Sequence, residues 1–169
     1  MHPLVKLAKD AVELYIREGK VLEVLEERLP PELLGRAGVF VCLKLGGMLR
    51  GCIGTYHPTE PNIARETVRN AIHAATCDPR FTPVRKEDFD KIEYTVDILT
   101  GPEPISDRKG LDPKRYGVIV QSGQRRGLLL PDLDGVDTVE QQIAIAMQKA
   151  GIRPGSDIQI YRFEVKRFT

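Results

Sequence analysis

The strongest constraint on the fold of this chain is the segment 39–55, whose pattern is that of a β-hairpin. Aliphatic residues alternate with other types over seven positions, in the order Val39, Phe40, Val41, Cys42, Leu43, Lys44 and Leu45. This two-residue period is typical of a strand with one buried face. Gly46-Gly47 then supplies a turn, and Leu49-Arg50-Gly51-Cys52-Ile53-Gly54 returns as the second strand.

The register of the hairpin decides which side chains share a face. A three-residue loop opposes odd-numbered positions and gathers in the core Val41, Leu43, Leu49 and Ile53. The other face then carries Cys42, Lys44, Arg50 and Cys52, with Cys42 opposite Cys52 or Arg50. An arginine beside a cysteine favours the thiolate, so Cys52 is a candidate nucleophile. A small buried cysteine beside a surface arginine explains the same pattern.

Amphipathic periods predict three helices. The first spans about residues 4–18, the second runs from a cap at Thr59 to about Ala75, and the third follows a cap at Asp137 and ends before Gly151. The apolar stripe of the second helix is Ala64, Val68, Ala71, Ile72 and Ala75, which leaves Glu66, Arg69, Asn70 and His73 on the solvated side.

Further strands are predicted at 92–99 and 158–168, with a second hairpin at 116–121 and 125–130. Hairpins mixed with helices, without regular βαβ alternation, indicate an α+β fold with a mainly antiparallel sheet and flanking helices. The length of 169 residues suits a single domain over 1–169, within which about 107–135 is a candidate smaller lobe.

Composition excludes several function classes. The net charge of +1 gives no general attraction to nucleic acid or to an anionic membrane. No apolar run is long enough to span a bilayer, and the N-terminus has no secretory pattern, so we expect a cytoplasmic protein. Cys42, Cys52 and Cys77 match no disulfide framework, which predicts three free thiols in a reducing compartment.

Several residues are candidate partners for Cys52. His57 lies five positions further on in a Pro-bounded loop and is a candidate base. Glu93 and Asp97 share the polar face of their strand, where ordinary solvated charges are the alternative, more so for Asp97. Gly51 and Gly54 let a ligand approach the backbone, and Arg80 lies in a Pro-rich loop of the kind that often carries function.

The sequence gives weaker support to two other kinds of site, a metal site and a patch that binds RNA or anions. His73 and Cys77 have the spacing of a metal-ligand pair, but His73 falls on the solvated helix face, and we assign no metal or cofactor. Four arginines around the second helix and its loop raise the alternative of an RNA or anion patch, namely Arg65, Arg69, Arg80 and Arg85. The near-neutral total charge favours a mixed surface instead.

The hexapeptide Leu49–Gly54 resembles the LRGCIG signature of the AMMECR domain family, also called protein A of the AmmeMemoRadiSam system. The resemblance extends along the chain through Gly38–Val41, Asp78–Phe81, Leu99–Ile105, Arg126–Pro131 and Tyr161–Phe163. It implies an α+β fold with a larger and a smaller lobe. It also implies two partners, a Memo-type protein resembling dioxygenases and a radical SAM protein. A catalytic or binding role is suspected in the family for the LRGCIG segment.

These observations lead to a first hypothesis and two alternatives. In the first, the chain is an enzyme or enzyme subunit in which Cys52 reacts, Arg50 favours its thiolate or holds an anionic substrate, and Glu93 or His57 handles protons. In the second, the same segment is a recognition surface of a binding module without enzymatic activity. The third, an accessory role in RNA binding or nucleotide modification, depends on the arginines alone.

Overall fold

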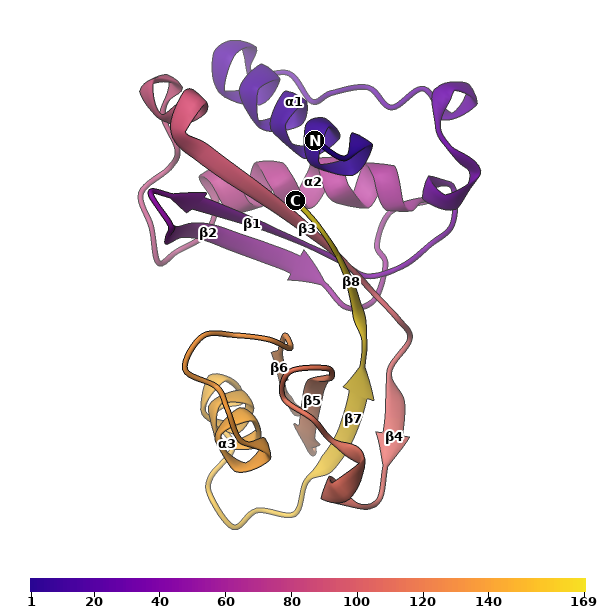
Figure 1. Cartoon of the computed structure of the whole chain (residues 1–169), viewed down its shortest axis with the longest axis vertical. Helices are drawn as coiled ribbons and strands as arrows, with labels where there is room; N and C mark the ends of the chain where they lie inside the picture. The colour runs from indigo at the N-terminus through magenta and orange to yellow at the C-terminus, as the bar shows by residue number, and fades with distance from the viewer. The chain divides into compact units, whose positions relative to one another are not determined.

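The computed structural model describes all 169 residues, which form two compact units (Figure 1). The first unit contains residues 1–99 and 166–169, and the second contains residues 100–165. The chain therefore leaves the first unit after Leu99 and returns to it at Lys166. The candidate lobe at 107–135 lies inside the second unit.

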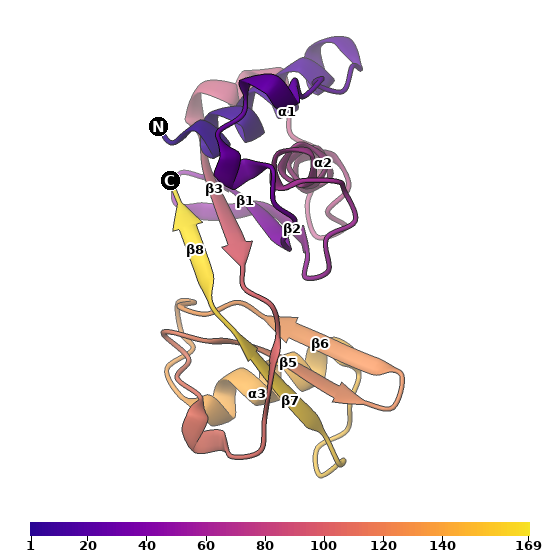
Figure 2. The same ribbon diagram turned by 90° about the vertical axis from the view of Figure 1, so that its right-hand side faces the viewer.

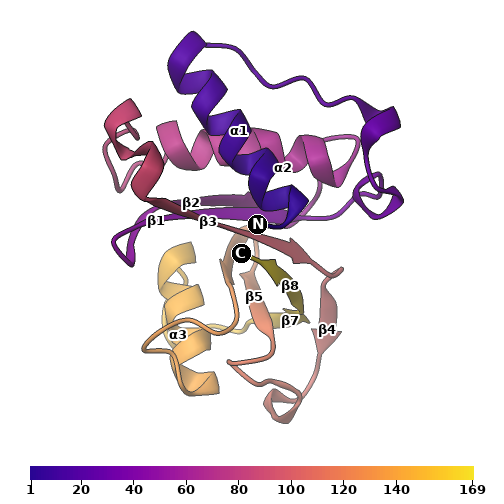
Figure 3. The same cartoon turned by 45° about the horizontal axis from the view of Figure 1, so that its top comes forward.

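The first unit is a four-stranded sheet with two helices on one face, as Figures 1 and 3 show. The strand order is β2 (Met48–Thr55), β1 (Val39–Leu45), β3 (Ile92–Leu99) and β8 (Val165–Phe168), and β1 is antiparallel to both of its neighbours. The helices are α1 (Pro3–Glu18) and α2 (Ile63–Thr76). Short 3-10 turns are η1 (Glu26–Arg28), η2 (Pro31–Leu33) and η3 (Lys86–Lys91). The core lies between the sheet and the helices.

The second unit has a sheet and a core of its own. The strand order is β4 (Glu103–Ile105), β7 (Gln159–Phe163), β5 (Gly117–Ser122) and β6 (Arg125–Leu129). The helix α3 (Val139–Ala150) packs against β5 and β6 (Figure 2), and η4 (Arg108–Gly110) follows β4. The predicted α+β class and both hairpins are confirmed. The predicted last strand is instead two strands, divided at Glu164 between the two sheets.

Two helix starts differ from the prediction because neighbouring side chains make better caps. Asn62 begins α2, since its Oδ1 accepts the amide N–H of Arg65 at 2.9 Å. Thr138 begins α3, where it forms a capping box with Gln141. Thr59 and Asp137 lie just outside these helices. None of the helices is both long and apolar enough to cross a membrane.

Each unit contains a strand glycine on which a helix rests. A Cβ atom added to Gly51 in β2 would lie 2.1 Å from the carbonyl oxygen of Ala74 in α2. A Cβ added to Gly127 in β6 would lie 2.0 Å from the carbonyl oxygen of Ala146 in α3. Glycine is therefore needed at both positions for the helix to approach the sheet.

Gly51→Ala should destabilise the protein by about 2 kcal/mol or more, because the new methyl group forces α2 away from β2. Urea unfolding measures the change. Gly35→Ala is the matched control, since a Cβ at Gly35 meets no atom within 4 Å, and it should change the free energy of unfolding by less than about 0.5 kcal/mol. Equal effects of the two substitutions would contradict the packing role of Gly51.

Candidate functional site

The hairpin that carries LRGCIG closes by a shorter turn than predicted. Leu45 pairs with Met48 across Gly46-Gly47, and a bulge then leaves Arg50 as an extra residue between the pairs Lys44–Leu49 and Leu43–Gly51. Beyond the bulge the predicted odd-to-odd register holds, and Cys42 is opposite Cys52. The bulge also explains why the core position predicted for Leu49 is wrong, since this side chain is 40% exposed.

Cys42 and Cys52 form a disulfide, so the prediction of three free thiols is wrong for these two residues. Cys77 is free and exposed. The amide N–H of Cys52 points away from β1 toward Asp78, which identifies the cysteines as a non-hydrogen-bonded pair. Such pairs bring opposite Cα atoms to about 4.5 Å, and these two are 4.1 Å apart. The strand register itself thus brings the sulfur atoms together.

The disulfide lies on the sheet face turned away from α1 and α2. Residues that alternate with the buried Val41 and Leu43 form this face, which we name the cysteine face: Phe40, Cys42, Lys44, Cys52, Gly54, Glu93, Thr95 and Asp97. Lys44 is two residues from Cys42 and directly opposite Glu93. Glu93 therefore lies on the same sheet face as the cysteines, but β1 separates it from Cys52.

Arg50 anchors the loop that follows α2. Its guanidinium donates hydrogen bonds to the carbonyl oxygens of Thr82 and Pro83, the second at 3.1 Å, and to Thr82 Oγ1 at 3.3 Å. All of its hydrogen bonds go to this loop and none to Cys52. These acceptors are all neutral groups, so the contacts of Arg50 with the loop are hydrogen bonds and not ion pairs.

The same loop covers the outer edge of β2 through Asp78 and Arg80. Asp78 Oδ2 accepts the Cys52 amide N–H at 2.9 Å, and Arg80 Nη2 donates to the Cys52 carbonyl oxygen at 3.2 Å. Arg80 also binds both Asp78 oxygens, at 3.0 and 2.7 Å. Two side chains thus replace the next strand of the sheet and protect an edge that would otherwise pair with another chain.

These contacts change the pKa of Asp78. The Asp78 side chain is only 2% exposed. The hydrogen bonds from Arg80 lower its pKa to about 2, against the effect of burial, and the Cys52 amide contributes in the same direction. The predicted ligand residue Arg80 is therefore held by an ion pair, although its side chain stays half exposed.

The chain itself fills the space beside both glycines of the motif. Gly51 lies under α2, and a Cβ on Gly54 would be 2.2 Å from the ring of Phe40. These contacts give both glycines a packing role in place of the ligand approach expected from the sequence. The close packing of Gly54 and Phe40 is on the cysteine face, next to the disulfide in the strand order.

Two polar residues of α2 that the helical pattern placed in solvent are buried. Glu66 accepts hydrogen bonds from the side chain of Thr55 and from the amides of Thr59 and Glu60, the last two at 2.7 Å. Burial raises the pKa of Glu66, but these hydrogen bonds outweigh burial and lower it. Asn70 donates to the Val39 carbonyl at 2.9 Å. Glu66 thus fastens the loop after LRGCIG to the helix, and Asn70 fastens the start of β1 and the end of β2.

The other predicted partners of Cys52 lie elsewhere. His57 is exposed in the loop that follows the end of β2 at Thr55, and its ring packs against Tyr56. The solvated position expected for Asp97 is wrong, since it is 1% exposed and receives two 2.8 Å hydrogen bonds from Arg167. In the sequence, only the last predicted strand points to this ion pair, because it brings Arg167 beside β3.

The four arginines proposed as an anion patch are mostly paired. Arg65 is 3.4 Å from Glu26, Arg69 is 3.9 Å from Glu60, and Arg80 binds Asp78. No three His, Cys, Asp or Glu side chains come together in an arrangement that could hold a metal ion.

Asp78→Asn should remove stability that depends on pH. Because the pKa of Asp78 is about 2 in the folded protein and the usual value is 3.8, the ionised carboxylate adds on the order of 2 kcal/mol to the free energy of unfolding of wild type at neutral pH. This gain is complete above about pH 5 and disappears as pH falls from 4 through 2. Urea unfolding of both proteins across this range should give converging stabilities at low pH. Asp157→Asn, at an exposed position, is the control, and its stability should change with pH as that of wild type does. If the stability of Asp78→Asn also changed with pH as that of wild type does, the lowered pKa of Asp78 would be refuted.

Several known proteins are similar to this chain in sequence or in structure. A protein of Thermotoga maritima is 58% identical over 170 residues, covering 99% of this chain and 97% of that protein. Protein CA_C1420 of Clostridium acetobutylicum is 47% identical over 166 residues, covering 98% of this chain but 35% of that longer protein. The crystal structure of the uncharacterized protein PH0010 from Pyrococcus horikoshii superimposes with a TM-score of 0.89 at 36% identity, covering 97% of this chain and 88% of that one.

The sequence model of the AMMECR1 family matches residues 5–168, nearly the whole chain. It includes the hairpin, the Asp78–Arg80 edge and both sheets, which agrees with the resemblance seen in the LRGCIG hexapeptide. The chain belongs to the AMMECR1 family.

Proposed function

We propose that Cys42 and Cys52 form a thiol–disulfide redox centre and that the chain is a subunit of an enzyme that exchanges electrons through it. The observation that carries the proposal is the bond between two directly opposed cysteines on the face turned away from the helices. Arg50, Gly51 and Gly54 have packing or anchoring contacts. Packing does not explain why two sulfur atoms, those of Cys42 and Cys52, meet at this point.

A purely stabilising disulfide is a weaker explanation of this bond. Cross-links stabilise more when they close longer loops of the unfolded chain, and this one joins cysteines only ten positions apart. The turn and the strand pairing already hold the two segments together. A redox role needs no long loop, only two sulfur atoms that can separate and rejoin.

The redox step transfers two electrons from a protein dithiol. A thiolate of the partner attacks Cys52 Sγ, the disulfide breaks, and Cys42 leaves as a thiolate. The second thiolate of the partner then attacks the partner's own sulfur in the mixed disulfide and releases Cys52. The partner ends as a disulfide, and two protons from solvent convert Cys42 and Cys52 to thiols.

Nearby charges support this direction of attack. Lys44 shares the cysteine face with Cys42, and a cation beside the leaving sulfur favours its thiolate. Glu93 lies opposite Lys44, so we propose that Glu93, rather than His57, passes the solvent proton to Cys42. Cys52 lies on the edge strand, whereas Cys42 lies between two strands, which favours Cys52 as the sulfur that a partner attacks.

The partner dithiol is expected in another protein or another region. The family resemblance implies a Memo-type dioxygenase-like protein and a radical SAM protein. The Clostridium relative supports joint action, because nearly two thirds of its length lies outside the match to this chain. We infer that this chain supplies the disulfide and that a partner supplies the site for the substrate.

Thiol counting and alkylation test the centre. Without reductant, the denatured chain should show one thiol, that of Cys77, and after reduction it should show three. In the reduced folded protein, Cys52 should alkylate faster than Cys42. Three thiols before reduction, or equal slow labelling of both, would refute the proposal.

A trapping experiment identifies the attacked sulfur. Thioredoxin that lacks its resolving cysteine serves as the probe, and we expect a mixed disulfide at Cys52, located by mass spectrometry. Cys77→Ser should trap the probe equally well, since Cys77 is outside the pair. Capture at Cys42, or no capture, would count against Cys52 as the reacting group.

The exposed hairpin tip favours a second candidate, a recognition surface for a protein partner. Met48 is 75% exposed and Leu49 is 40% exposed, side by side at the start of β2. Apolar side chains in this position are typical anchors of protein interfaces. Substitution of Gly51 or Gly54 cannot test this role cleanly, because both glycines are required for packing.

Met48→Asp together with Leu49→Asp should abolish binding of a Memo-type partner protein if the tip is the recognition surface, while Cys52→Ser leaves binding nearly unchanged. Isothermal titration calorimetry measures both. Leu34→Asp is the matched control, because Leu34 is also an exposed apolar residue, at 43%. Unchanged binding by the double variant would exclude the tip.

A further inference from the structure

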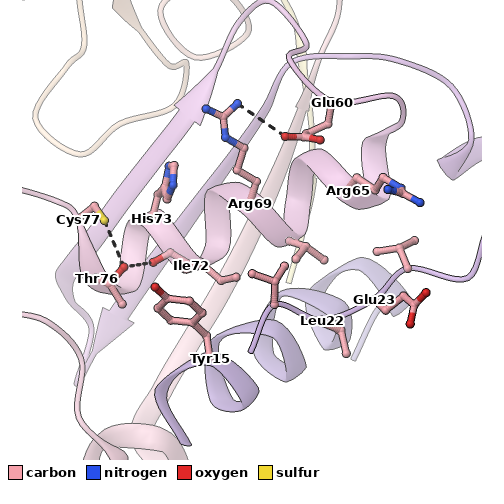
Figure 4. A pocket seen from close by; sticks show the side chains of 13 residues that line it. Tyr15, Leu22, Glu23, Glu60, Arg65, Arg69, Ile72, His73, Thr76 and Cys77 are labelled. Carbon is pink, nitrogen blue, oxygen red and sulfur yellow. Dashed lines mark hydrogen bonds and ion pairs between the residues drawn. The ribbon is translucent and has the colours of Figure 1, made fainter. Parts of the chain in front are cut away.

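The first unit contains a pocket of about 610 Å³ on its helical side (Figure 4). Its walls come from the last turn of α1, the extended segment 21–24 and the outer flank of α2. The cysteine face is on the other side of the sheet, so this pocket is separate from the redox centre. Its volume is within the range of pockets that hold small organic molecules.

The middle of the pocket is apolar. Val68 and Ile72, one turn apart on α2, face Leu22 and Val24 of the extended segment. Figure 4 shows Ile72 and Leu22 between the charged side chains at one end and Tyr15 at the other. A ligand with an apolar body therefore gains binding free energy here, because it displaces water from these apolar side chains.

One end of the pocket carries a cation with unused donors. Arg69 donates from Nη1 to Thr59 Oγ1, and the same nitrogen is 3.9 Å from Glu60. Its Nε–H and Nη2–H groups have no acceptor within the chain. The Nε–H and one Nη2–H are parallel along one edge of the planar guanidinium, and this geometry suits a carboxylate.

Two further polar groups of the lining lack partners in the chain. His73 follows Arg69 by one helical turn, so both project from the same flank of α2 (Figure 4). Neither its ring nitrogens nor the hydroxyl of Tyr15 makes a hydrogen bond within the protein. A ligand oxygen near Arg69 can thus reach a second donor or acceptor at His73.

The acidic residues of the rim limit the charge of the ligand. Glu23 and Glu60 line the pocket together with Arg65 and Arg69, and Figure 4 shows Glu60 beside Arg69. The four charges sum to zero, so a polyphosphate would meet two carboxylates without a surplus of cations. A single negative charge placed on Arg69 avoids this repulsion.

We propose that this pocket binds a small organic monocarboxylate with an apolar chain. The carboxylate lies against Arg69 and His73, and the chain extends along Val68, Ile72 and Leu22. The proposal is independent of the redox centre, since no residue of the pocket lies on the cysteine face.

Octanoate is the probe, and titration calorimetry measures its binding to the full chain. We expect binding by wild type, a weakening of about tenfold for Arg69→Gln through the lost charged hydrogen bonds, and a smaller loss for His73→Gln. Arg153→Gln, a matched control in the second unit, should bind as wild type. Octylamine and octanol should bind at least tenfold more weakly than octanoate.

Labelling of Cys77 gives a second readout, because this exposed thiol also lines the pocket. Octanoate should slow the reaction of Cys77 with maleimide in wild type and have little effect in Arg69→Gln. Leu22→Gln should weaken octanoate through the apolar wall while the variant keeps its fold, as circular dichroism verifies. Equal binding of octanoate and octylamine, or unchanged binding by Arg69→Gln, would overturn the proposal.

Discussion

The hydrogen bond from the Cys52 amide to Asp78 is the interaction on which the first unit most depends. It joins the end of α2 to the outer edge of β2, and Arg80 completes it from the other side at the Cys52 carbonyl. The amide that points to Asp78 cannot also bind β1, so Cys52 must face Cys42 as a closely spaced, non-hydrogen-bonded pair. Edge protection and the meeting of the two sulfur atoms therefore have one geometric cause.

The helix α2 contacts both proposed sites of the first unit, the disulfide-bonded hairpin and the pocket. Ala74 rests on Gly51, and Glu66 and Asn70 hold the strand end and the loop after the motif. The opposite flank of the helix, with Arg69 and His73, is left for the pocket. One helix thus uses its sheet-facing side to fix LRGCIG and its outer side to form the proposed ligand site.

The sequence pattern predicted the hairpins and the α+β class, and it left Cys42 opposite either Cys52 or Arg50, because each of these follows from local alternation and turn residues. It failed where a polar side chain is buried by partners distant in sequence. Glu66 falls on the polar side of a helical projection, and only the loop of Thr59 and Glu60 explains its burial. Asp97 depends in the same way on Arg167, seventy positions later. The pocket was also unpredictable, since segment 21–24 has no period.

The packing of LRGCIG changes which substitutions can reveal a function. Gly51 and Gly54 are pressed against Ala74 and Phe40, so replacing either one would damage any activity of the hairpin by moving the strands. Loss of activity in such variants would say nothing about chemistry. Replacing either cysteine by serine removes the bond while keeping a side chain of similar size. The contrast between Cys42→Ser and Cys52→Ser therefore separates the sulfur that reacts from the sulfur that leaves.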